Sequence, residues 1–241
     1  MTAGTVDDRA RAERRVAWDG LDRRPWTPPG VRTVVVTPHP DDEVLGCGGL
    51  IATQRANNVE VVIVAVTDGE ASHPGVEGVD PHRLRRRRRD EQRAALELLG
   101  AGAALVHRLG LADGAVTADE ARLAELLAEV VRPDDLLVAP WEHDHHCDHE
   151  ACGRAARLVA RRCRCTTLGS LVWAPSRTDP RSAPPGELLE LSLDQAAQEA
   201  RLAAIDVHRS QTQALGGPAV VTDELLANIS RPTERFVSVW P

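Results

Sequence analysis

The sequence contains no lysine and no tyrosine, and it has only one phenylalanine and one methionine. All 29 basic residues are therefore arginine, which excludes Schiff-base and other lysine-dependent covalent chemistry. Aromatic residues make up 2% of the chain and hydrophobic residues 42%, so the core must be built mainly from Val, Leu and Ala. This composition favours strands packed under helices over an aromatic-rich β-sandwich.

Long apolar runs and paired cysteine motifs are also missing. No apolar run reaches the roughly 18 residues of a membrane-spanning helix, and residues 1–19 lack the apolar core of a signal peptide. The five cysteines form an odd set without a Cys-x-x-Cys pair, which suits a reducing compartment. The net charge of -7 argues against affinity for nucleic acid or acidic membranes. We therefore expect a cytoplasmic protein with a small-molecule partner.

The chain of 241 residues divides into an arm and one domain. Residues 1–30 are expected to form an N-terminal arm, a short charged helix that ends at a turn containing Pro28 and Gly30. Residues 31–241 are expected to form the domain. The arm could pack against its own domain or against a second subunit. In the second case the protein would be a homo-oligomer.

The middle of the chain alternates between two kinds of pattern. Short β-branched or aliphatic runs predict buried strands at 31–37, 59–66, 106–111 and 135–140. Periodic segments predict helices at 43–56, 82–99, 117–131 and from 148 onward. This alternation predicts an α/β fold, a Rossmann-like, doubly wound and mainly parallel sheet in a single domain. Ligands of such folds bind beyond the carboxyl ends of the strands.

The last third of the chain is expected to add a hairpin and a helix to this domain. We predict hairpin strands near Leu171 and Leu189, joined by a Pro- and Ser-rich loop at 175–186. A helix at 192–208 and a terminal strand at 236–240 are expected to follow.

The first cluster of polar residues, His39–Glu43, directly follows a predicted strand. Acidic residues in a first helical turn can simply cap the helix. However, the three-residue step from His39 to Asp42 lets both side chains face one point, while Asp41 between them points elsewhere. Two ligands beside a free carboxylate are what a hydrolytic zinc site requires.

The second cluster, His143–His149, holds four of the nine histidines of the chain in seven residues. A surface loop is the alternative interpretation. One histidine from this cluster would complete a site with three protein ligands and an open position, the pattern of catalytic zinc. Mixed His and Asp donors fit Zn²⁺ better than Mg²⁺ or Ca²⁺, while Fe²⁺ and Co²⁺ remain open.

The two clusters and several shorter motifs resemble the LmbE-like or PIG-L family of zinc-dependent deacetylases. The first cluster corresponds to that family's (A/P)HPDDE motif. The resemblance runs from about residue 31 to 211. It is carried further by Thr67–Glu70 (TxGE), Arg88 with Glu91, Ala95, Leu99 and Gly100 (RxxExxxAxxxLG), Leu109–Gly114 (LGLPDG), Asp144–His149 (DxHPDH), and His208, Ser210 and Gln211 (HxSQ).

The resemblance implies roles for individual residues of the metal site. It implies that His39, Asp42 and His149 ligate zinc. It also implies that Asp41 is the general base and that His146 is an electrophile or acid oriented by Asp148. In this role His146 would be protonated and would stabilise the oxyanion or protonate the departing nitrogen.

Residues outside the metal ligands are predicted to contact the substrate. Glu70, Arg88 and Asp113 are candidates for binding sugar hydroxyls. Trp141 could stack on a sugar or belong to the core. Cys147 stands where the family usually has Pro, so the loop loses a fixed φ and gains a potential soft ligand.

The sequence therefore predicts a zinc-dependent N-deacetylase. The resemblance implies that it removes an N-acetyl group from an N-acylated amine, in an amino-sugar-containing small molecule or natural-product glycoside. An amidase acting on a thiol conjugate and a non-catalytic metal-binding accessory module remain alternatives. Intact Asp41 and His146 count against the module, since metal binding alone requires neither.

Overall fold

The computed structural model describes residues 4–183 and 185–239. The strands are β1 (Arg23–Pro25), β2 (Thr33–Thr37), β3 (Val61–Ala65), β4 (Leu105–Arg108), β5 (Leu136–Pro140), β6 (Thr166–Ser170), β7 (Leu188–Ser192) and β8 (Thr233–Val239). The helices are α1 (Gly4–Asp19), α2 (Asp42–Ala56), α3 (Pro81–Leu98), the 3-10 helix η1 (Val116–Asp119), α4 (Glu120–Val130), α5 (Cys147–Cys163), α6 (Ala174–Arg177), α7 (Gln195–Asp206), α8 (Arg209–Thr212) and α9 (Asp223–Ile229). None of these helices is long and apolar enough to cross a membrane.

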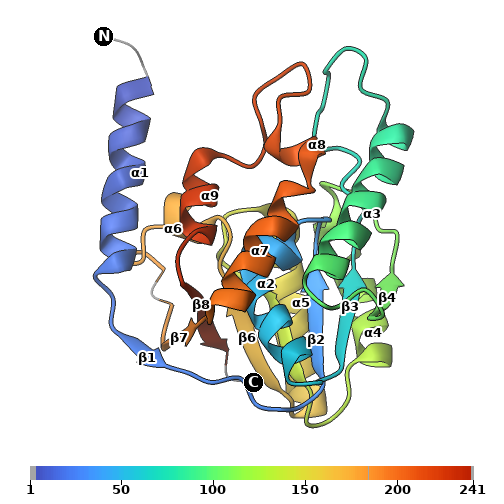
Figure 1. Ribbon diagram of the computed structural model, residues 1–241, viewed down its shortest axis with the longest axis vertical. Helices are drawn as coiled ribbons and strands as arrows, with labels where there is room; N and C mark the ends of the chain where they lie inside the picture. The colour runs from blue at the N-terminus through green and yellow to red at the C-terminus, as the bar shows by residue number, and fades with distance from the viewer. Residues whose placement is uncertain (1–3, 184, 240–241) are drawn as a thin grey trace.

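The strands form one sheet in the order β1-β7-β8-β6-β5-β2-β3-β4 (Figure 1). All neighbouring pairs are parallel except those of β8, which is antiparallel to both β6 and β7. The chain proceeds from β2 outward through β3 to β4 and then returns to the other side of β2 at β5. This reversal confirms the doubly wound fold, and it places a topological switch point between β2 and β5.

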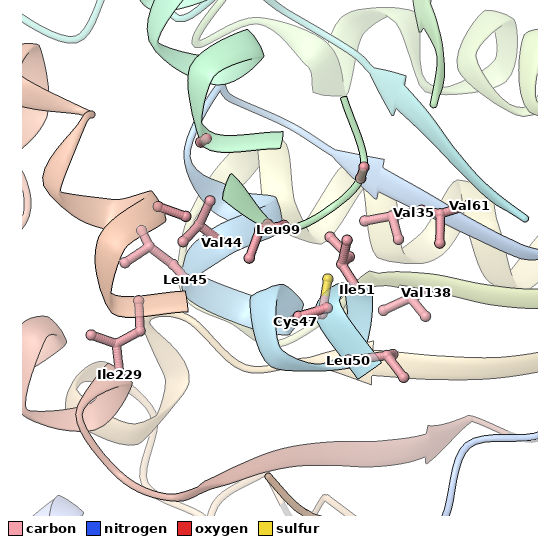
Figure 2. Close-up of a cluster of buried hydrophobic side chains, with 14 of the residues drawn as sticks. Val35, Val44, Leu45, Cys47, Leu50, Ile51, Val61, Leu99, Val138 and Ile229 are labelled. Atoms are coloured by element: carbon pink, nitrogen blue, oxygen red, sulfur yellow. The ribbon is translucent and has the colours of Figure 1, made fainter. Parts of the chain in front are cut away.

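Helices cover both faces of the sheet because its central strands are apolar on both sides. On one face Val35 of β2 joins a cluster with Leu50 of α2 and Leu99 after α3 (Figure 2). On the other face its neighbour Val34 joins a cluster with Leu123 of α4 and Val159 of α5. Successive strand side chains point to opposite faces, so a fully apolar strand serves two cores at once.

The N-terminal arm packs against its own domain. The indole of Trp18 is buried at the end of α1, and its Nε1 donates a hydrogen bond to the carbonyl oxygen of Thr178 at 2.8 Å. Residues Arg23–Pro25 then form β1, which pairs in parallel with β7 at the sheet edge. The arm therefore supplies one strand of the sheet, a strand that the sequence did not indicate.

The predicted hairpin between residues near Leu171 and Leu189 is wrong. The two strands, β6 and β7, lie on either side of β8 and do not pair with each other. Both are antiparallel to β8 and hence parallel to one another, and parallel strands cannot be joined by a tight turn. The segment between them instead includes α6, which packs on α1.

Other boundaries differ from those predicted. The predicted strand at 106–111 is the shorter β4, and the terminal strand starts earlier, at Thr233; Trp240 lies outside the described residues. The sequence analysis also missed α9, although the side chain of Thr222 caps it by accepting from the Leu225 N–H.

Candidate functional site

The two polar clusters meet at the switch point of the sheet. His39–Glu43 follows β2, and His143–His149 follows the adjacent strand β5. Both strands end at the same edge because they are parallel, so their following loops lie side by side. The expected convergence of these two clusters is confirmed.

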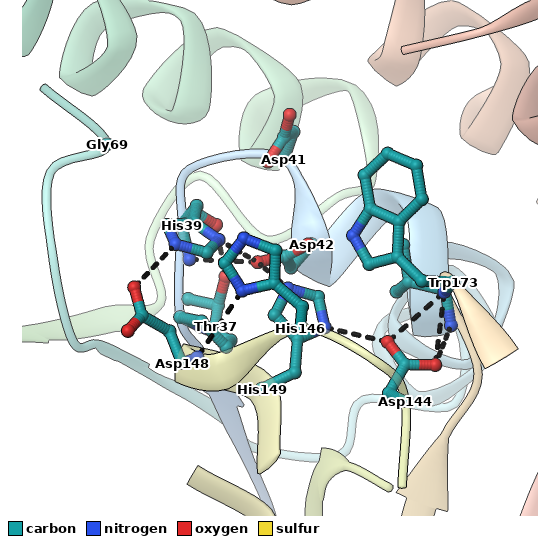
Figure 3. Close-up of polar contacts among 12 residues, drawn as sticks. Thr37, His39, Asp41, Asp42, Gly69, Asp144, His146, Asp148, His149 and Trp173 are labelled. Atoms are coloured by element: carbon teal, nitrogen blue, oxygen red, sulfur yellow. Dashed lines mark hydrogen bonds and ion pairs between the residues drawn. The ribbon is translucent and has the colours of Figure 1, made fainter. Parts of the chain in front are cut away.

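His39, Asp42 and His149 come together where these two loops meet (Figure 3). Oδ2 of Asp42 lies 3.0 Å from Nδ1 of His39 and 3.2 Å from Nε2 of His149. All three side chains are buried, and Nε2 of His149 has no hydrogen-bond partner among the described residues. Two imidazole nitrogens and a carboxylate oxygen around one point form a donor set suited to a divalent transition metal.

The outer nitrogen of each imidazole is fixed by a carboxylate. Nε2 of His39 lies 3.1 Å from Oδ2 of Asp148 and 3.1 Å from Oδ1 of Asp113. Nδ1 of His149 lies 2.8 Å from Oδ2 of Asp144. These contacts leave the other nitrogen of each ring facing Asp42. Histidines that bind metals are commonly oriented by carboxylates in this way.

A second group of potential ligands, His39, His146 and Asp148, shares one histidine with the first. Its carboxylate is already engaged, because Asp148 accepts the N–H of Gly114 at 2.8 Å and that of Val116 at 3.1 Å. The geometry therefore favours the group that contains Asp42.

The carboxylates make this point attractive to positive charge. Burial opposes protonation of His149, but Asp42 and Asp144 outweigh it and raise its pKa to about 9. Burial likewise disfavours the charged form of His39, whose pKa is nevertheless raised by Asp113, Asp148 and Asp42. Positive charge is thus stabilised here, either as protons on the imidazoles or as a metal cation.

Asp41 is the N-cap residue of α2, but its side chain projects away from the two histidines and does not cap the helix. Its φ of 149° is a strained value for a residue with a side chain, and its carboxylate makes no capping hydrogen bond with the described backbone. Burial raises the pKa of Asp41 to about 7, although the guanidinium of Arg88 opposes the shift. A buried carboxylate that titrates near neutrality beside a metal-binding group has the properties of a general base.

Arg88 holds Asp41 in place. Its Nη2 donates to Oδ1 of Asp41 at 3.1 Å and to the Pro40 carbonyl at 3.0 Å, and its Nη1 donates to the Gly69 carbonyl at 2.9 Å. Gly69 has a φ of 67°, and a Cβ there would collide with the guanidinium. A glycine after β3 is therefore needed for this arginine to reach the site.

His146 lies against the same site but is held differently from the prediction. Its Nδ1 accepts the backbone N–H of Asp148 at 3.3 Å, while the Asp148 carboxylate contacts His39 instead. Burial, followed by the charges of His149 and His39, lowers the pKa of His146 to about 4. This shift favours a neutral ring over the protonated form expected from the sequence, and an accepting Nδ1 leaves the proton of the neutral ring on Nε2.

A cavity of about 460 Å³ opens above these groups. Its lining includes His39, Asp41, Asp42, Arg88, Asp113, His146, Cys147, Trp173, Arg177 and Gln211. Two of the three predicted substrate-binding residues, Arg88 and Asp113, are among them. The third, Glu70, forms an ion pair with Arg85 at 2.7 Å and is not part of this lining.

Sequence analysis missed several residues around the cavity. Asp144 was recognised as part of the DxHPDH motif, but no function was assigned to it. Trp173 and Arg177 were not predicted to belong to the site. Trp141, which could have stacked on a sugar, belongs instead to the core: it is 4% exposed and packs edge-on against Trp18 at 5.7 Å between ring centroids.

Comparison with known proteins agrees with this arrangement. Over 192 residues the chain is 30% identical to the probable N-acetyl-alpha-D-glucosaminyl L-malate deacetylase 2 of Bacillus subtilis, covering 76% of this chain and 84% of that protein. Among solved structures, N,N'-diacetylchitobiose deacetylase from Pyrococcus horikoshii aligns with a TM-score of 0.59 at 25% identity, covering 82% of this chain and 75% of that one.

A third similarity concerns the fold alone. The A40926 pseudoaglycone deacetylase Dbv21 aligns with a TM-score of 0.66 at 23% identity, covering 86% of this chain and 96% of that one. The sequence model of the PIG-L family, described as GlcNAc-PI de-N-acetylase, matches residues 34–160, a segment that contains both polar clusters. The chain therefore belongs to the PIG-L family of N-deacetylases.

Proposed function

We propose that this protein is a zinc-dependent hydrolase that removes the N-acetyl group from an amino sugar in a small glycoside. The observation that carries the proposal is the convergence of His39, Asp42 and His149 beside Asp41, a carboxylate that lines the cavity and is not one of the three potential ligands. A pure metal-binding module would have no use for that carboxylate.

We assign the metal to His39, Asp42 and His149. The position of His149 Nε2 supports this assignment, because this buried nitrogen faces Oδ2 of Asp42 at 3.2 Å without forming a hydrogen bond, and a metal ion between the two would satisfy both. Two nitrogens and one oxygen suit Zn²⁺, and Fe²⁺ or Co²⁺ would fit the same donors. A zinc ion bound there would polarise the amide carbonyl and lower the pKa of water toward about 7.

The remaining residues then have separate tasks. Asp41, positioned by Arg88, accepts a proton from the attacking water, and that proton becomes available to the departing nitrogen. Neutral His146 donates a hydrogen bond from Nε2 to the oxygen that gains negative charge. Asp148 acts through His39, whose orientation it fixes. Acetate and the free amine are the products.

The nature of the substrate is supported by the relatives. Their names specify an N-acetylglucosaminyl malate and diacetylchitobiose as substrates. Arg88 and Asp113 line the cavity and could hydrogen-bond sugar hydroxyls, although Arg88 is largely engaged by Asp41. We further propose a cytoplasmic location, which suits the five unpaired cysteines, and no nucleic-acid partner, which suits the acidic net charge.

The proposal is tested by measuring acetate release from a panel of N-acetylglucosaminides. The purified protein should be stripped with a chelator and reloaded separately with Zn²⁺, Fe²⁺ or Co²⁺. Activity that disappears on stripping and returns with zinc supports the proposal. Release from a cysteine conjugate but from no glycoside would favour the amidase, and no release with any metal or substrate would favour the accessory module.

A further inference from the structure

Trp173 and Arg177 form a second polar feature of the catalytic cavity. Trp173 directly precedes α6, and Arg177 ends that helix. The guanidinium carbon of Arg177 lies 3.7 Å from the centroid of the Trp173 ring, and both side chains line the cavity. Figure 3 shows Trp173 on the side of the site opposite Asp148. Trp173, on which Arg177 stacks, therefore lies across the site from the Asp148 carboxylate.

The pair is held firmly in place. The Trp173 N–H lies 3.0 and 3.1 Å from the two oxygens of Asp144, the carboxylate that also holds His149. From α1, Nε of Arg14 donates to the Ser176 carbonyl at 2.6 Å, and the Trp18 indole donates to that of Thr178. The arm thus fixes the backbone of α6 from outside, so ordering this segment costs less entropy when a ligand binds.

Apart from its stacking on Trp173, the guanidinium of Arg177 makes no hydrogen bond or ion pair with the described residues, whereas nearby Arg181 pairs with Asp179. The other arginine of the cavity, Arg88, is bound to Asp41. Partial burial of the guanidinium lowers the pKa of Arg177, a shift that the charge of Asp144 opposes, while the residue as a whole remains exposed to solvent. An anion bound here would form charge-assisted hydrogen bonds with the Arg177 guanidinium.

We propose that Arg177, stacked on Trp173, binds an anionic oxygen group on the substrate at the end remote from the acetamido group. The inference deepens the proposed function and depends on it, since the acetamido group must sit at the metal end of the same cavity. A volume of about 460 Å³ has room for a sugar and a substituent. The anion could be a carboxylate on the aglycone or a phosphate on the sugar.

Matched substrates test the preference for charge. Activity of the zinc-loaded enzyme would be measured on three pairs of substrates. Two pairs compare a para-carboxyphenyl N-acetylglucosaminide with its methyl ester, once as the α anomer and once as the β anomer. The third pair compares N-acetylglucosamine 6-phosphate with N-acetylglucosamine. We expect kcat/KM to favour the anionic member of at least one pair by about tenfold or more, mainly through KM. The pair that responds identifies whether the anion lies on the aglycone or on the sugar.

Substitutions then locate the effect. Arg177→Gln should bring the charged-to-neutral ratio to about one, and Arg177→Lys should recover part of it because the charge remains without the planar stacking. The control is Arg181→Gln, an exposed position in the following loop outside the cavity lining, which should keep the wild-type ratio. A ratio near one in wild type for all three pairs, or a preference that survives Arg177→Gln, would overturn the proposal.

A binding measurement separates this proposal from the proposed function. Dissociation constants of the same substrate pairs would be measured calorimetrically with zinc-loaded Asp41→Asn, in which turnover is suppressed. Tighter binding of the charged member that is lost in Asp41→Asn/Arg177→Gln supports the subsite even if wild type releases no acetate. Equal binding of both members would reject the subsite even if deacetylation is observed.

Discussion

Nδ1 of His149 lies 2.8 Å from Oδ2 of Asp144, and the other oxygen of that carboxylate accepts the backbone N–H groups of Val172 and Ala174 at 3.1 and 2.8 Å. Asp144 thus connects a proposed zinc ligand after β5 to the loop that follows β6. It orients the ring of His149 so that Nε2 faces Asp42. The position of the ligand depends on a neighbouring strand as well as on its own loop.

We predict that Asp144→Asn weakens zinc binding by about tenfold to a hundredfold. The amide can still accept the backbone N–H groups, but it no longer supplies the negative charge that stabilises a metal-bound imidazole. Zinc affinity would be measured by competition with a chromogenic chelator. The matched control is Asp90→Asn, at an exposed position of α3, which should leave the affinity unchanged. Equal zinc affinities for Asp144→Asn and wild type would contradict this role.

His149→Ala should remove most of the zinc affinity, because it leaves only His39 and Asp42 of the assigned ligands. Metal analysis of the purified protein should show about one zinc per chain in wild type and far less in the variant. The variant should remain folded, which circular dichroism would check. Stoichiometric, tight zinc in His149→Ala would show that another residue is the third ligand, and His146 would then be the first to test.

The sequence predicted those parts of the site that depend only on which residues directly follow each strand. His39–Glu43 and His143–His149 follow adjacent parallel strands, so their convergence follows from the fold class. The contact of Arg88 with Asp41 joins residues 47 positions apart, and its geometry depends on where α3 packs. Trp173 is placed by a loop whose path the sequence pattern does not specify. Such contacts are decided by tertiary packing and not by periodicity.

The error at the sheet edge has a similar cause. Strands were predicted close to β6 and β7, but their partner β8 lies more than 40 residues beyond β7. A hairpin was inferred because sequential strands often pair. The three residues of β1 carry too little pattern to be recognised as a strand, and their place in the sheet follows from the docking of α1.

The arm is predicted to contribute to stability in a pH-dependent way through Asp19. Its carboxylate accepts from Arg231 and Arg235 at 2.7 and 2.8 Å, and the hydrogen bond from Arg231 is the main cause that lowers its pKa from the ordinary 3.8. A carboxyl whose pKa is depressed on folding stabilises the protein above its unfolded pKa, and this stabilisation is lost as the pH falls through the folded pKa.

Asp19→Asn should therefore lower the free energy of unfolding by about 1 kcal/mol near neutral pH, a value reduced by solvent screening at this partly exposed position. The difference from wild type should shrink below about pH 4. Urea unfolding of both proteins at neutral and acidic pH would measure it. Asp22→Asn, at an exposed position of the same arm, is the control and should have little effect. A difference that grows on acidification would contradict the assignment.

The neighbouring carboxylates Asp41 and Asp42 are predicted to have different roles. Asp42 faces both histidines, whereas Asp41 contacts Arg88 and lines the cavity. Asp41→Asn should keep zinc but lower kcat by at least about a hundredfold, because an amide can hydrogen-bond water but cannot accept its proton. Asp42→Asn should instead weaken zinc binding, because a neutral amide oxygen is a poorer ligand than a carboxylate.

Zinc affinity and the rate of acetate release, measured on both variants, distinguish the possible outcomes. If Asp41→Asn loses zinc and Asp42→Asn keeps it, the assigned base and ligand must be exchanged. If both variants keep zinc and full activity, His39–Glu43 is not the catalytic cluster. The strained φ of Asp41 adds a further expectation. Asparagine tolerates positive φ better than most residues, so Asp41→Asn should add no backbone strain, although it removes the ion pair with Arg88. Circular dichroism and urea unfolding of the variant would check that a loss of rate reflects chemistry and not unfolding.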